Sequence, residues 1–172
     1  YIQGGVGNDR LIGKASADTY VYNLGDGNDV INDLSTFSIR IIDPLIVDLD
    51  KDGLETHAFG QGTLFDHNDD GNLELTGWVK PDDGLLVYDR NNDGVINSGR
   101  ELFGDQTRLQ NGEIAEEGLQ ALAELDSNLD GMISSLDSQW GKLQVWQDAN
   151  SNGLTDDGEL RDLSDVGITD IQ

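Results

Sequence analysis

Hydrophobic residues in this chain occur in short runs, and these runs lead directly into loops rich in Asp, Asn and Gly. Residues 45–47 (Leu-Ile-Val) and 85–88 (Leu-Leu-Val-Tyr) are two runs of this kind. Short apolar runs bounded by turn residues are typical of β-strands. We therefore expect brief strands separated by acidic loops, with more residues in the loops than in the strands.

Residues 114–125 have a different spacing, which predicts a helix. Ile114, Leu119, Leu122 and Leu125 recur at intervals close to one helix face, and no proline interrupts the segment, although Gly118 weakens it. Helices and strands do not alternate in a βαβ rhythm, so we expect an α+β module organised around its loops. The expected anchors of its modest core are five aromatic side chains: Phe65, Trp78, Phe103, Trp140 and Trp146.

The first 36 residues carry glycine-rich motifs at short intervals. Gly4–Ile12 match a nonapeptide whose glycines form tight turns, whose Asp and turn carbonyls bind calcium, and whose apolar residues form a short strand. Asp9 and Asp18 are nine residues apart, and Asp29 follows eleven residues later. The segment resembles the end of an RTX parallel β-roll. We therefore expect a β-roll fragment at 1–36 with Asp9, Asp18 and Asp29 as calcium ligands, a linker at 37–43, and the main module at 44–172.

The charge of the chain changes this picture, because 34 acidic and 10 basic residues give a net charge of -24. Such a chain repels itself unless counter-ions bind at fixed places, and its charge argues against nucleic acid as a partner. The acids recur at metal-ligand spacing, which distinguishes the chain from a disordered acidic segment. The chain has no cysteine, and its oxygen ligands favour calcium over zinc. No apolar run approaches the roughly 18 residues of a membrane span, and we expect a monomer.

Five loops carry ligands at the spacing of an EF-hand calcium loop. Such a loop has side-chain oxygens at positions 1, 3 and 5, glycine at position 6, a backbone carbonyl at position 7 and a carboxylate at position 12. Two of the five loops match this scheme throughout. Their predicted calcium ligands are Asp126, Asn128, Asp130, Met132 and Asp137 in one, and Asp148, Asn150, Asn152, Leu154 and Glu159 in the other.

The other three loops match only the first half of the scheme, and ordinary Asx-rich turns are the alternative for them. One has Arg100 at position 12, so we expect the next residue to close it; its predicted ligands are Asp89, Asn91, Asp93, Val95 and Glu101. The remaining two need closing ligands from elsewhere, and the candidates are Glu55, Glu74, Asp82 and Asp83. Their own predicted ligands are Asp48, Asp50, Asp52 and Leu54 in one, and Asp66, Asn68, Asp70 and Asn72 in the other.

Calcium in these loops bears directly on folding. Five divalent ions in the loops, with one or two more in the β-roll, would offset roughly half of the net charge. Without them, neighbouring carboxylates repel, and a small core cannot offset the entropy of the chain. We therefore expect the calcium-free chain to be expanded and mostly unstructured.

Four motifs together give the chain a specific resemblance. They are residues 43–50 (Asp-Pro-Leu-Ile-Val-Asp-Leu-Asp), 76–79 (Thr-Gly-Trp-Val), 82–86 (Asp-Asp-Gly-Leu-Leu) and 99–104 (Gly-Arg-Glu-Leu-Phe-Gly). This combination resembles the self-processing module of FrpC-like RTX proteins, and the resemblance runs from about Asp43 to the C-terminus. It implies a secreted or cell-surface protein. It also implies calcium-triggered cleavage of the Asp43-Pro44 peptide bond, followed in some molecules by joining of Asp43 to a lysine amine.

The residue types at this bond suit that reaction. The side-chain carboxylate of Asp43 can reach its own main-chain carbonyl carbon and close a five-membered cyclic anhydride. Pro44 supplies a tertiary amide, whose nitrogen departs more easily once it is protonated. Water opening the anhydride gives hydrolysis, whereas a neutral lysine amine gives an isopeptide bond.

Several roles in this reaction stay open in the sequence. Calcium could act by folding the module, or also as a Lewis acid on the scissile carbonyl. Either His57 or His67 could protonate the leaving nitrogen, although a solvated loop histidine is the commoner role. The acceptor amine could belong to another protein or to one of four lysines of this chain: Lys14, Lys51, Lys80 and Lys142.

Two other functions compete with self-processing. The first is a non-catalytic calcium-binding module that folds after export and serves as a structural or adhesion element of a secreted protein. The second is a calcium sensor, which is weaker because sensors open a Met-rich groove and this chain has one methionine, Met132.

Overall fold

The chain, described here from a computed structural model, divides into two compact units, Tyr1–Ile41 and Ile42–Gln172. The structure describes residues 2–3, 10–12, 20–21, 30–32, 44–57 and 62–172. In the first unit these residues form two separate pairs of short parallel strands. The pairs are β1 (Ile2–Gln3) with β3 (Tyr20–Val21), and β2 (Arg10–Ile12) with β4 (Val30–Asn32).

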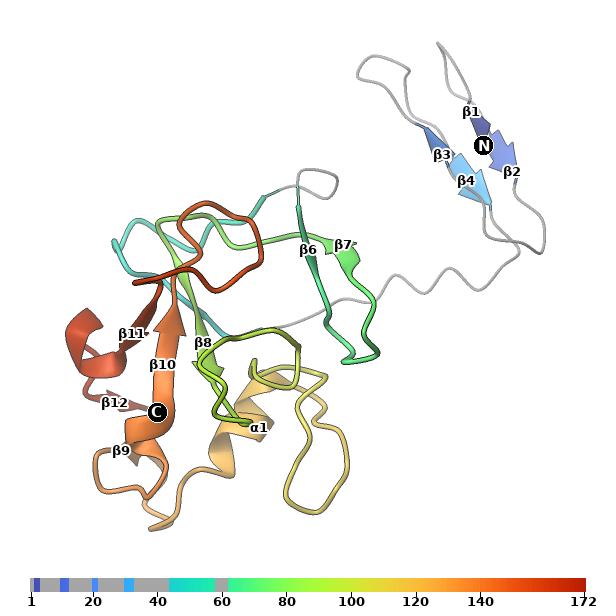
Figure 1. Cartoon of the computed structure of the whole chain (residues 1–172). Helices are drawn as coiled ribbons and strands as arrows, with labels where there is room; N and C mark the ends of the chain where they lie inside the picture. Colours follow the sequence, from blue (N-terminus) through green and yellow to red (C-terminus); the bar gives the residue numbers. More distant parts are fainter. Residues whose placement is uncertain (1, 4–9, 13–19, 22–29, 33–43, 58–61) are drawn as a thin grey trace. The chain divides into compact units, whose positions relative to one another are not determined.

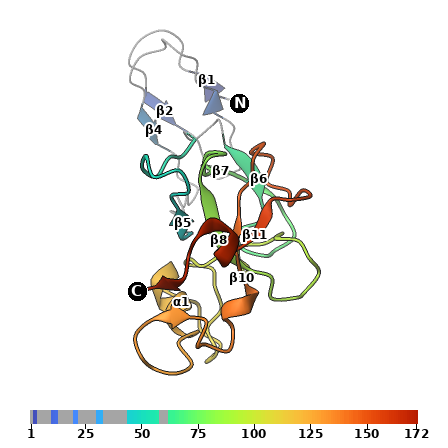
Figure 2. The same ribbon diagram turned by 90° about the vertical axis from the view of Figure 1, so that its left-hand side faces the viewer.

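The second unit is built around a four-stranded antiparallel sheet with the order β11-β10-β8-β5. Its strands are β5 (Ile46–Val47), β8 (Gly84–Tyr88), β10 (Leu143–Trp146) and β11 (Leu160–Asp162). Figure 1 shows β8 and β10 running side by side, and Figure 2 shows β5 next to β8. The two apolar runs that predicted strands at 45–47 and 85–88 thus lie in neighbouring strands of one sheet.

The sheet is covered on both faces, because successive side chains of a strand point to opposite sides. Leu86 of β8 packs into a cluster with Phe103 and residues of α1, which we call the helix-side cluster. Leu85 and Val87 pack into a second cluster around Phe65, Trp78 and Trp146, which we call the aromatic cluster. Four of the five predicted aromatic anchors are therefore buried, and Trp140 is half-buried against the helix-side cluster.

Smaller elements complete the second unit. Two further antiparallel pairs are β6 (Thr63–Phe65) with β7 (Glu74–Thr76), and β9 (Ile133–Ser134) with β12 (Asp170–Ile171). The helices are α1 (Gly118–Ala123) and two short 3-10 helices, η1 (Trp140–Lys142) and η2 (Leu163–Val166). None of the described helices has the length and apolarity needed to cross a membrane.

The predicted fold class, an α+β module preceded by a parallel β-roll, is wrong. The regular secondary structure of the second unit is mostly short strands in antiparallel sheets, and its one α-helix in the described residues has six residues. Helical periodicity predicted too much helix, because most of this unit consists of loops that are fixed by side-chain hydrogen bonds. The loops that contain Asp9, Asp18 and Asp29 lie outside the described residues.

The predicted helix at 114–125 is correspondingly too long. Ile114 forms an isolated β-bridge with Arg108, and α1 begins only at Gly118. A Cβ atom on Gly118 would lie 2.5 Å from the carbonyl oxygen of Phe103 and 2.9 Å from Cγ of Leu45. The glycine that weakens the helical pattern is therefore required by close packing at the start of the helix.

Candidate metal centres

The five acidic loops share one backbone conformation. The residue at position 4 of each loop has a left-handed φ between 55° and 70°, and the glycine at position 6 also has a positive φ. In the described residues, no other non-glycine position has a positive φ. Sequence reasoning missed position 4 because its occupants have no chemistry in common: Lys51, Asp69, Asn92, Leu129 and Ser151.

The Asp at position 1 holds each loop in this conformation. Its carboxylate accepts a hydrogen bond from the backbone N–H of the glycine at position 6, at 2.8 to 3.1 Å. In the loop that begins at Asp66, for example, Oδ2 accepts from Gly71 and Oδ1 accepts from Asp70. The backbone wraps around the carboxylate, which brings the oxygens at positions 1, 3 and 5 to the inner side of the turn.

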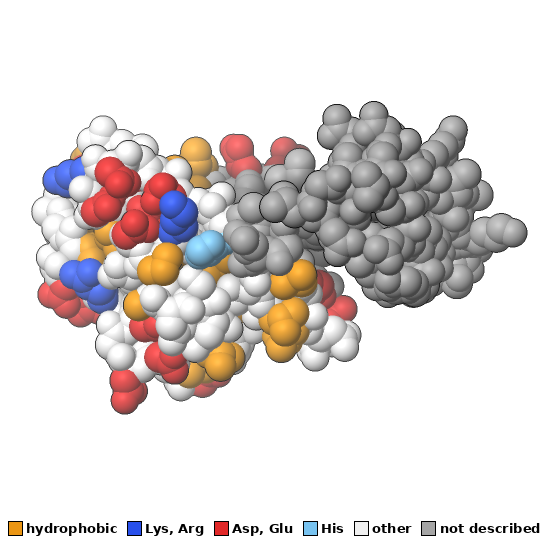
Figure 3. All heavy atoms as spheres, turned by 90° about the horizontal axis from the view of Figure 1, so that it is seen from above, with side chains coloured by type: hydrophobic (Ala, Val, Ile, Leu, Met, Phe, Trp, Pro, Cys, Tyr) orange, Lys and Arg blue, Asp and Glu red, His pale blue; other side chains and the backbone are white. Residues whose placement is uncertain are grey.

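Carboxylate groups from the first three loops gather closely enough to hold a metal ion. In each cluster the oxygens of three residues lie within 4.8 Å of one another. The space-filling view in Figure 3 shows acidic side chains in separate groups on the face that it presents, with few basic ones between them. The three clusters are Asp48, Asp50 and Asp83; Asp66, Asp70 and Glu74; and Asp89, Asp93 and Glu101.

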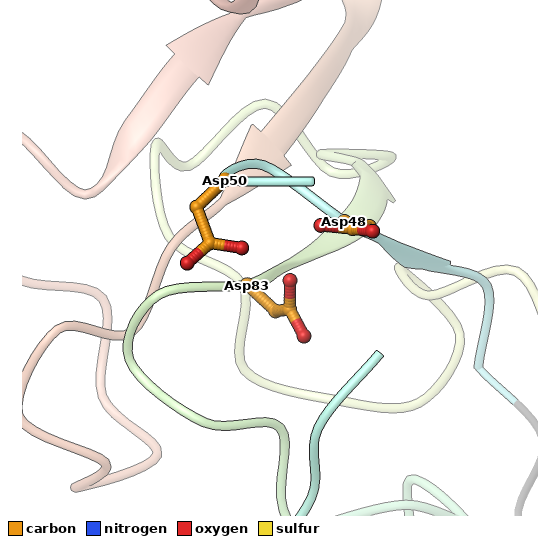
Figure 4. Close-up of side chains that lie close together, drawn as sticks. All are labelled: Asp48, Asp50 and Asp83. Carbon is orange, nitrogen blue, oxygen red and sulfur yellow. The ribbon is translucent and has the colours of Figure 1, made fainter. Parts of the chain in front are cut away.

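The first cluster is completed from a distant part of the sequence. Asp83 immediately precedes β8, is 1% exposed, and accepts hydrogen bonds from the backbone N–H groups of Leu49 at 3.4 Å and Glu55 at 2.8 Å. Figure 4 shows its carboxylate turned toward Asp50, with Asp48 at the end of β5. Of the closing candidates, Asp83 and Glu74 join clusters, whereas Asp82 is exposed and Glu55 pairs with Lys80 at 2.8 Å.

Asp52, a predicted ligand of the first loop, lies outside its three-carboxylate cluster. A hydrogen bond with Asp50 and the negative charge of that residue raise the pKa of Asp52. This arrangement indicates crowding of negative charge in the loop, which a bound cation would relieve.

The third cluster provides the strongest test of whether a cation fits. Glu101 is 3% exposed, and its Oε1 atom is buried without a hydrogen-bond partner, while Oε2 accepts from the backbone N–H of Asn97 at 3.0 Å. Burial raises the pKa of Glu101, and the charges of Asp93 and Asp89 raise it further. A buried carboxylate oxygen that faces two other carboxylates is unfavourable unless a positive ion joins them. The donors are all hard oxygens, so the cluster fits calcium.

The second cluster is assembled within the β6–β7 hairpin. Glu74 of β7 accepts hydrogen bonds from the backbone N–H of His67 and the side-chain amide of Asn68. A hydrogen bond from the backbone N–H of Asn72 lowers the pKa of Asp70, which favours its charged form. The predicted ligands Asp66, Asn68 and Asp70 therefore lie on one loop with their closing carboxylate.

The fourth loop satisfies its closing carboxylate with backbone donors. Asp137 accepts hydrogen bonds from the N–H groups of Ser127, Asn128 and Ser134. The hydrogen bond from Ser134 and those from Ser127 lower the pKa of Asp137. The side chains at positions 1, 3 and 5 of this loop are Asp126, Asn128 and Asp130, which are hydrogen-bonded to one another and to the loop backbone.

The fifth loop is joined to the aromatic cluster. Asp148 is fully buried, and its Oδ2 atom accepts a hydrogen bond from the indole N–H of Trp78 at 2.7 Å. Glu159 accepts from the backbone N–H of Ala149 at 3.0 Å and from the indole N–H of Trp146 at 3.3 Å. The amides of Asn150 and Asn152 both donate to Asp156, a residue outside the predicted ligand set, at 2.9 and 3.0 Å.

Four of the five residues predicted to offer a backbone carbonyl at position 7 have exposed side chains. Leu54 and Leu154 are 60% and 63% exposed, and Val95 and Asn72 are also exposed. Met132 is half-buried. The side chains at this position therefore contribute little to the core, which is compatible with a ligand role for the backbone carbonyl alone.

The chain around the predicted scissile bond is anchored immediately after Pro44. The backbone N–H of Leu45 donates to the carbonyl of Phe103 at 2.9 Å, and Pro44 lines a small cavity together with His67 and Asp105. His57 does not line this cavity; its Nε2 atom lies 3.3 Å from Oγ of Ser151. Asp43 and Lys14 lie outside the described residues, Lys51 and Lys142 are exposed, and Lys80 is paired with Glu55.

Comparison with known proteins assigns this arrangement of loops to a family. The model of the SPM domain family matches residues 45–172. The chain belongs to the SPM domain family. It is also 50% identical over 134 residues to the iron-regulated protein FrpA of Neisseria meningitidis serogroup C. The aligned region covers 77% of this chain and 12% of FrpA. These matches confirm that the chain is FrpA/FrpC-like, and this chain spans about an eighth of the length of that relative.

Proposed function

We propose that this chain is a calcium-dependent self-processing segment of a secreted RTX protein. In this proposal it cuts its own Asp43-Pro44 peptide bond and, in some molecules, joins Asp43 to a lysine amine. The observation that carries the proposal is the position of the family match, which begins at residue 45, directly after the Asp-Pro dipeptide. A bond that lies at the edge of the matched module is the expected target of a module that cuts its own chain.

Calcium enters the proposal through the acidic loops. The three carboxylate clusters and the fourth and fifth loops would hold the ions with Asp, Asn and Glu oxygens, and Asp9, Asp18 and Asp29 of the glycine-rich repeats would hold others. Bound calcium would neutralise the clustered carboxylates and so permit the loops to close.

The segment that follows the bond is fixed by the sheet. Leu45 is hydrogen-bonded to Phe103, and β5 pairs with β8 through Ile46 opposite Leu85 and Val47 opposite Gly84. The first carboxylate cluster begins at Asp48 and is closed by Asp83, so it connects the residues after β5 to the start of β8. Calcium-dependent closure of this cluster would therefore hold the leaving side of the bond, which supports a link between ion binding and cleavage.

The proposed reaction uses the carboxylate of Asp43 as the nucleophile. One carboxylate oxygen bonds to the main-chain carbonyl carbon of Asp43, the carbon–nitrogen bond to Pro44 breaks, and that nitrogen gains a proton. The product is a cyclic anhydride on Asp43 and a free secondary amine on Pro44. Water then opens the anhydride to two carboxylic acids, or a neutral lysine amine opens it to an amide and one carboxylic acid.

The test is a calcium-addition experiment on the whole chain purified in chelator. We expect millimolar calcium to generate two fragments, one ending at Asp43 and one beginning at Pro44, identified by gel and intact mass. Ligation would add a species one water lighter than the sum of its two parts. Asp43→Ala should remain intact under the same conditions, and so should Asp43→Glu over the same period, because Glu needs a larger ring.

Uncut wild-type chain after prolonged incubation would contradict the proposal. If that chain still became compact on calcium addition, the alternative function of a non-catalytic calcium-binding structural module would account for the acidic loops.

A further inference from the structure

A second feature of the SPM domain borders the third carboxylate cluster, because Arg90 and Arg100 are the sequence neighbours of Asp89 and Glu101. It is a cavity of about 430 Å³ beside the end of β8 and α1, within the size range of small-ligand sites. Its lining includes three guanidinium groups and the ring of Tyr88, with Leu109, Ala121 and Leu125 forming a buried apolar part. We call it the arginine pocket after Arg90, Arg100 and Arg108.

The charge of this cavity is opposite to that of the chain. Three of the 10 basic residues of the whole protein line it, although the net charge is -24. A fourth cation, Lys142, lies next to it, with Nζ 5.9 Å from the centroid of the Tyr88 ring. The acidic residue in the lining is Glu124, and one of its oxygens already accepts a hydrogen bond from the backbone N–H of Gln110 at 2.8 Å. Positive charge is thus concentrated around the apolar part of the arginine pocket.

The three arginines keep most of their donors available. Arg90 donates from Nε to the carbonyl of Arg100, and Arg108 donates from one terminal nitrogen to the carbonyl of Gly112, each at 2.8 Å. Arg100 pairs with Asp69 at 2.8 Å. A guanidinium has five N–H donors, so these contacts of the described residues leave several on each side chain.

One of these side chains is held in place by aromatic rings. The guanidinium carbon of Arg90 lies 4.9 Å from the ring centroid of Tyr88 and 5.8 Å from that of Phe103. Burial lowers the pKa of Arg90, yet a guanidinium stays charged at any physiological pH. A guanidinium positioned in this way binds an oxyanion more strongly than a freely mobile one, because less side-chain freedom is lost.

We propose that the arginine pocket binds the C-terminal carboxylate of a peptide whose preceding residues are apolar. Arginine forks match carboxylates in paired hydrogen bonds, and the leucine and alanine side chains suit an aliphatic body. The end that cleavage after Asp43 would create has this chemistry, since it reads Ile41-Ile42-Asp43 and carries two carboxylates on its last residue. That source rests on the proposed function; the binding preference itself does not.

The probe is a fluorescent synthetic peptide with the sequence of residues 36–43 and a free C-terminus. Binding to the full chain carrying Asp43→Ala, which cannot cut itself, is measured in calcium by fluorescence anisotropy. We expect saturable binding that weakens about tenfold when the peptide is amidated at its C-terminus, because one charge-assisted contact set is lost. Arg108→Met, an exposed position, should weaken binding similarly.

Arg161→Met is the matched control, because it removes the same charge from β11, outside the pocket lining. It should leave the affinity within about twofold, and a circular dichroism spectrum confirms that each variant is folded. Equal binding of the free and amidated peptides, equal loss in the two arginine variants, or no saturation at millimolar peptide would each overturn the assignment. Cleavage is read separately on a gel, so failure of the pocket and failure of self-processing give different results.

Discussion

The fourth and fifth acidic loops have nearly the same sequence pattern and the same backbone turn, yet they contribute differently to the fold. In the fourth loop, a Cβ atom added to Gly131 would meet nothing within 4 Å, and Leu129 is 87% exposed. In the fifth loop, Gly153 packs against Thr63 and Leu64 of β6, and Asp148 accepts a hydrogen bond from Trp78. Ligand spacing determines the turn, whereas contacts from outside the loop determine how strongly the rest of the domain depends on it.

The largest difference between the two loops should come from removing the Asp at position 1. Asp148→Ala leaves the buried indole N–H of Trp78 and the backbone N–H of Gly153 without their acceptor, while the N–H of Asn152 keeps Asn150. We expect a cost of about 3 to 5 kcal/mol in the free energy of unfolding. Asp126→Ala, in the more exposed loop, should cost about 1 to 2 kcal/mol. Urea unfolding in saturating calcium, followed by circular dichroism, measures both. Equal costs would show that the hydrogen bond between Trp78 and Asp148 contributes nothing to stability.

The glycines at position 6 provide a second comparison, with a slightly smaller effect. Both have positive φ, so alanine should cost about 1 to 2 kcal/mol at either position. At Gly153 the new Cβ would also lie 2.4 Å from Cγ2 of Thr63 and 2.6 Å from the carbonyl oxygen of Leu64, which adds about 1 to 3 kcal/mol. Gly153→Ala should therefore unfold at clearly lower urea than Gly131→Ala. A reversed order would contradict the packing described for β6.

The indole hydrogen bond can be isolated with a smaller change. Trp78→Phe keeps an aromatic ring in the aromatic cluster but removes the donor to Asp148, and we expect a loss of about 1 to 3 kcal/mol. The mutant should also bind calcium more weakly at the fifth loop, measured by titration calorimetry. Trp140→Phe is the control, because Trp140 is half-buried and packs against the helix-side cluster, away from Asp148.

The smallest expected effect is a gain in stability at position 4 of the fourth loop. Leu129 has a φ of 62°, a region that Asn adopts more easily than Leu. Leu129→Asn should therefore raise the free energy of unfolding by about 0.5 to 1 kcal/mol. Leu136→Asn, also an exposed leucine but without a left-handed φ, should give no such gain. Stabilisation by both substitutions would show that replacing an exposed leucine by a polar side chain, and not relief of the left-handed φ, is the cause.

The sequence predicted the acidic turns and the strands beside them because these depend on residues close together in the chain. The turn that begins at Asp66 is determined by its own Asp, Asn and Gly, and the strand at 84–88 follows from a continuous apolar run. Position 4 could not be predicted, since the left-handed φ is imposed by hydrogen bonds on whichever residue occupies it.

Features that depend on contacts between distant parts of the chain could not be predicted from the sequence. Asp82 and Asp83 are neighbours of the same type, and only the pairing of β8 with β5 determines which carboxylate turns toward the first loop. The helix prediction failed similarly, because close packing at Gly118 and a β-bridge at Ile114 override the apolar spacing. The fold class was wrong because the apolar spacing at 114–125 predicted more helix than the six residues of α1.

The burial of Asp83 at the start of β8 has a consequence for the order of events during folding. The other two three-carboxylate clusters draw on at most 13 consecutive residues, counted from Asp89 to Glu101, whereas the first spans Asp48 to Asp83. Closing a longer stretch of chain costs more entropy, so the short turns can assemble first. The loop after β5 would then acquire its third carboxylate only after β5 and β8 have paired, so the first cluster forms late in folding.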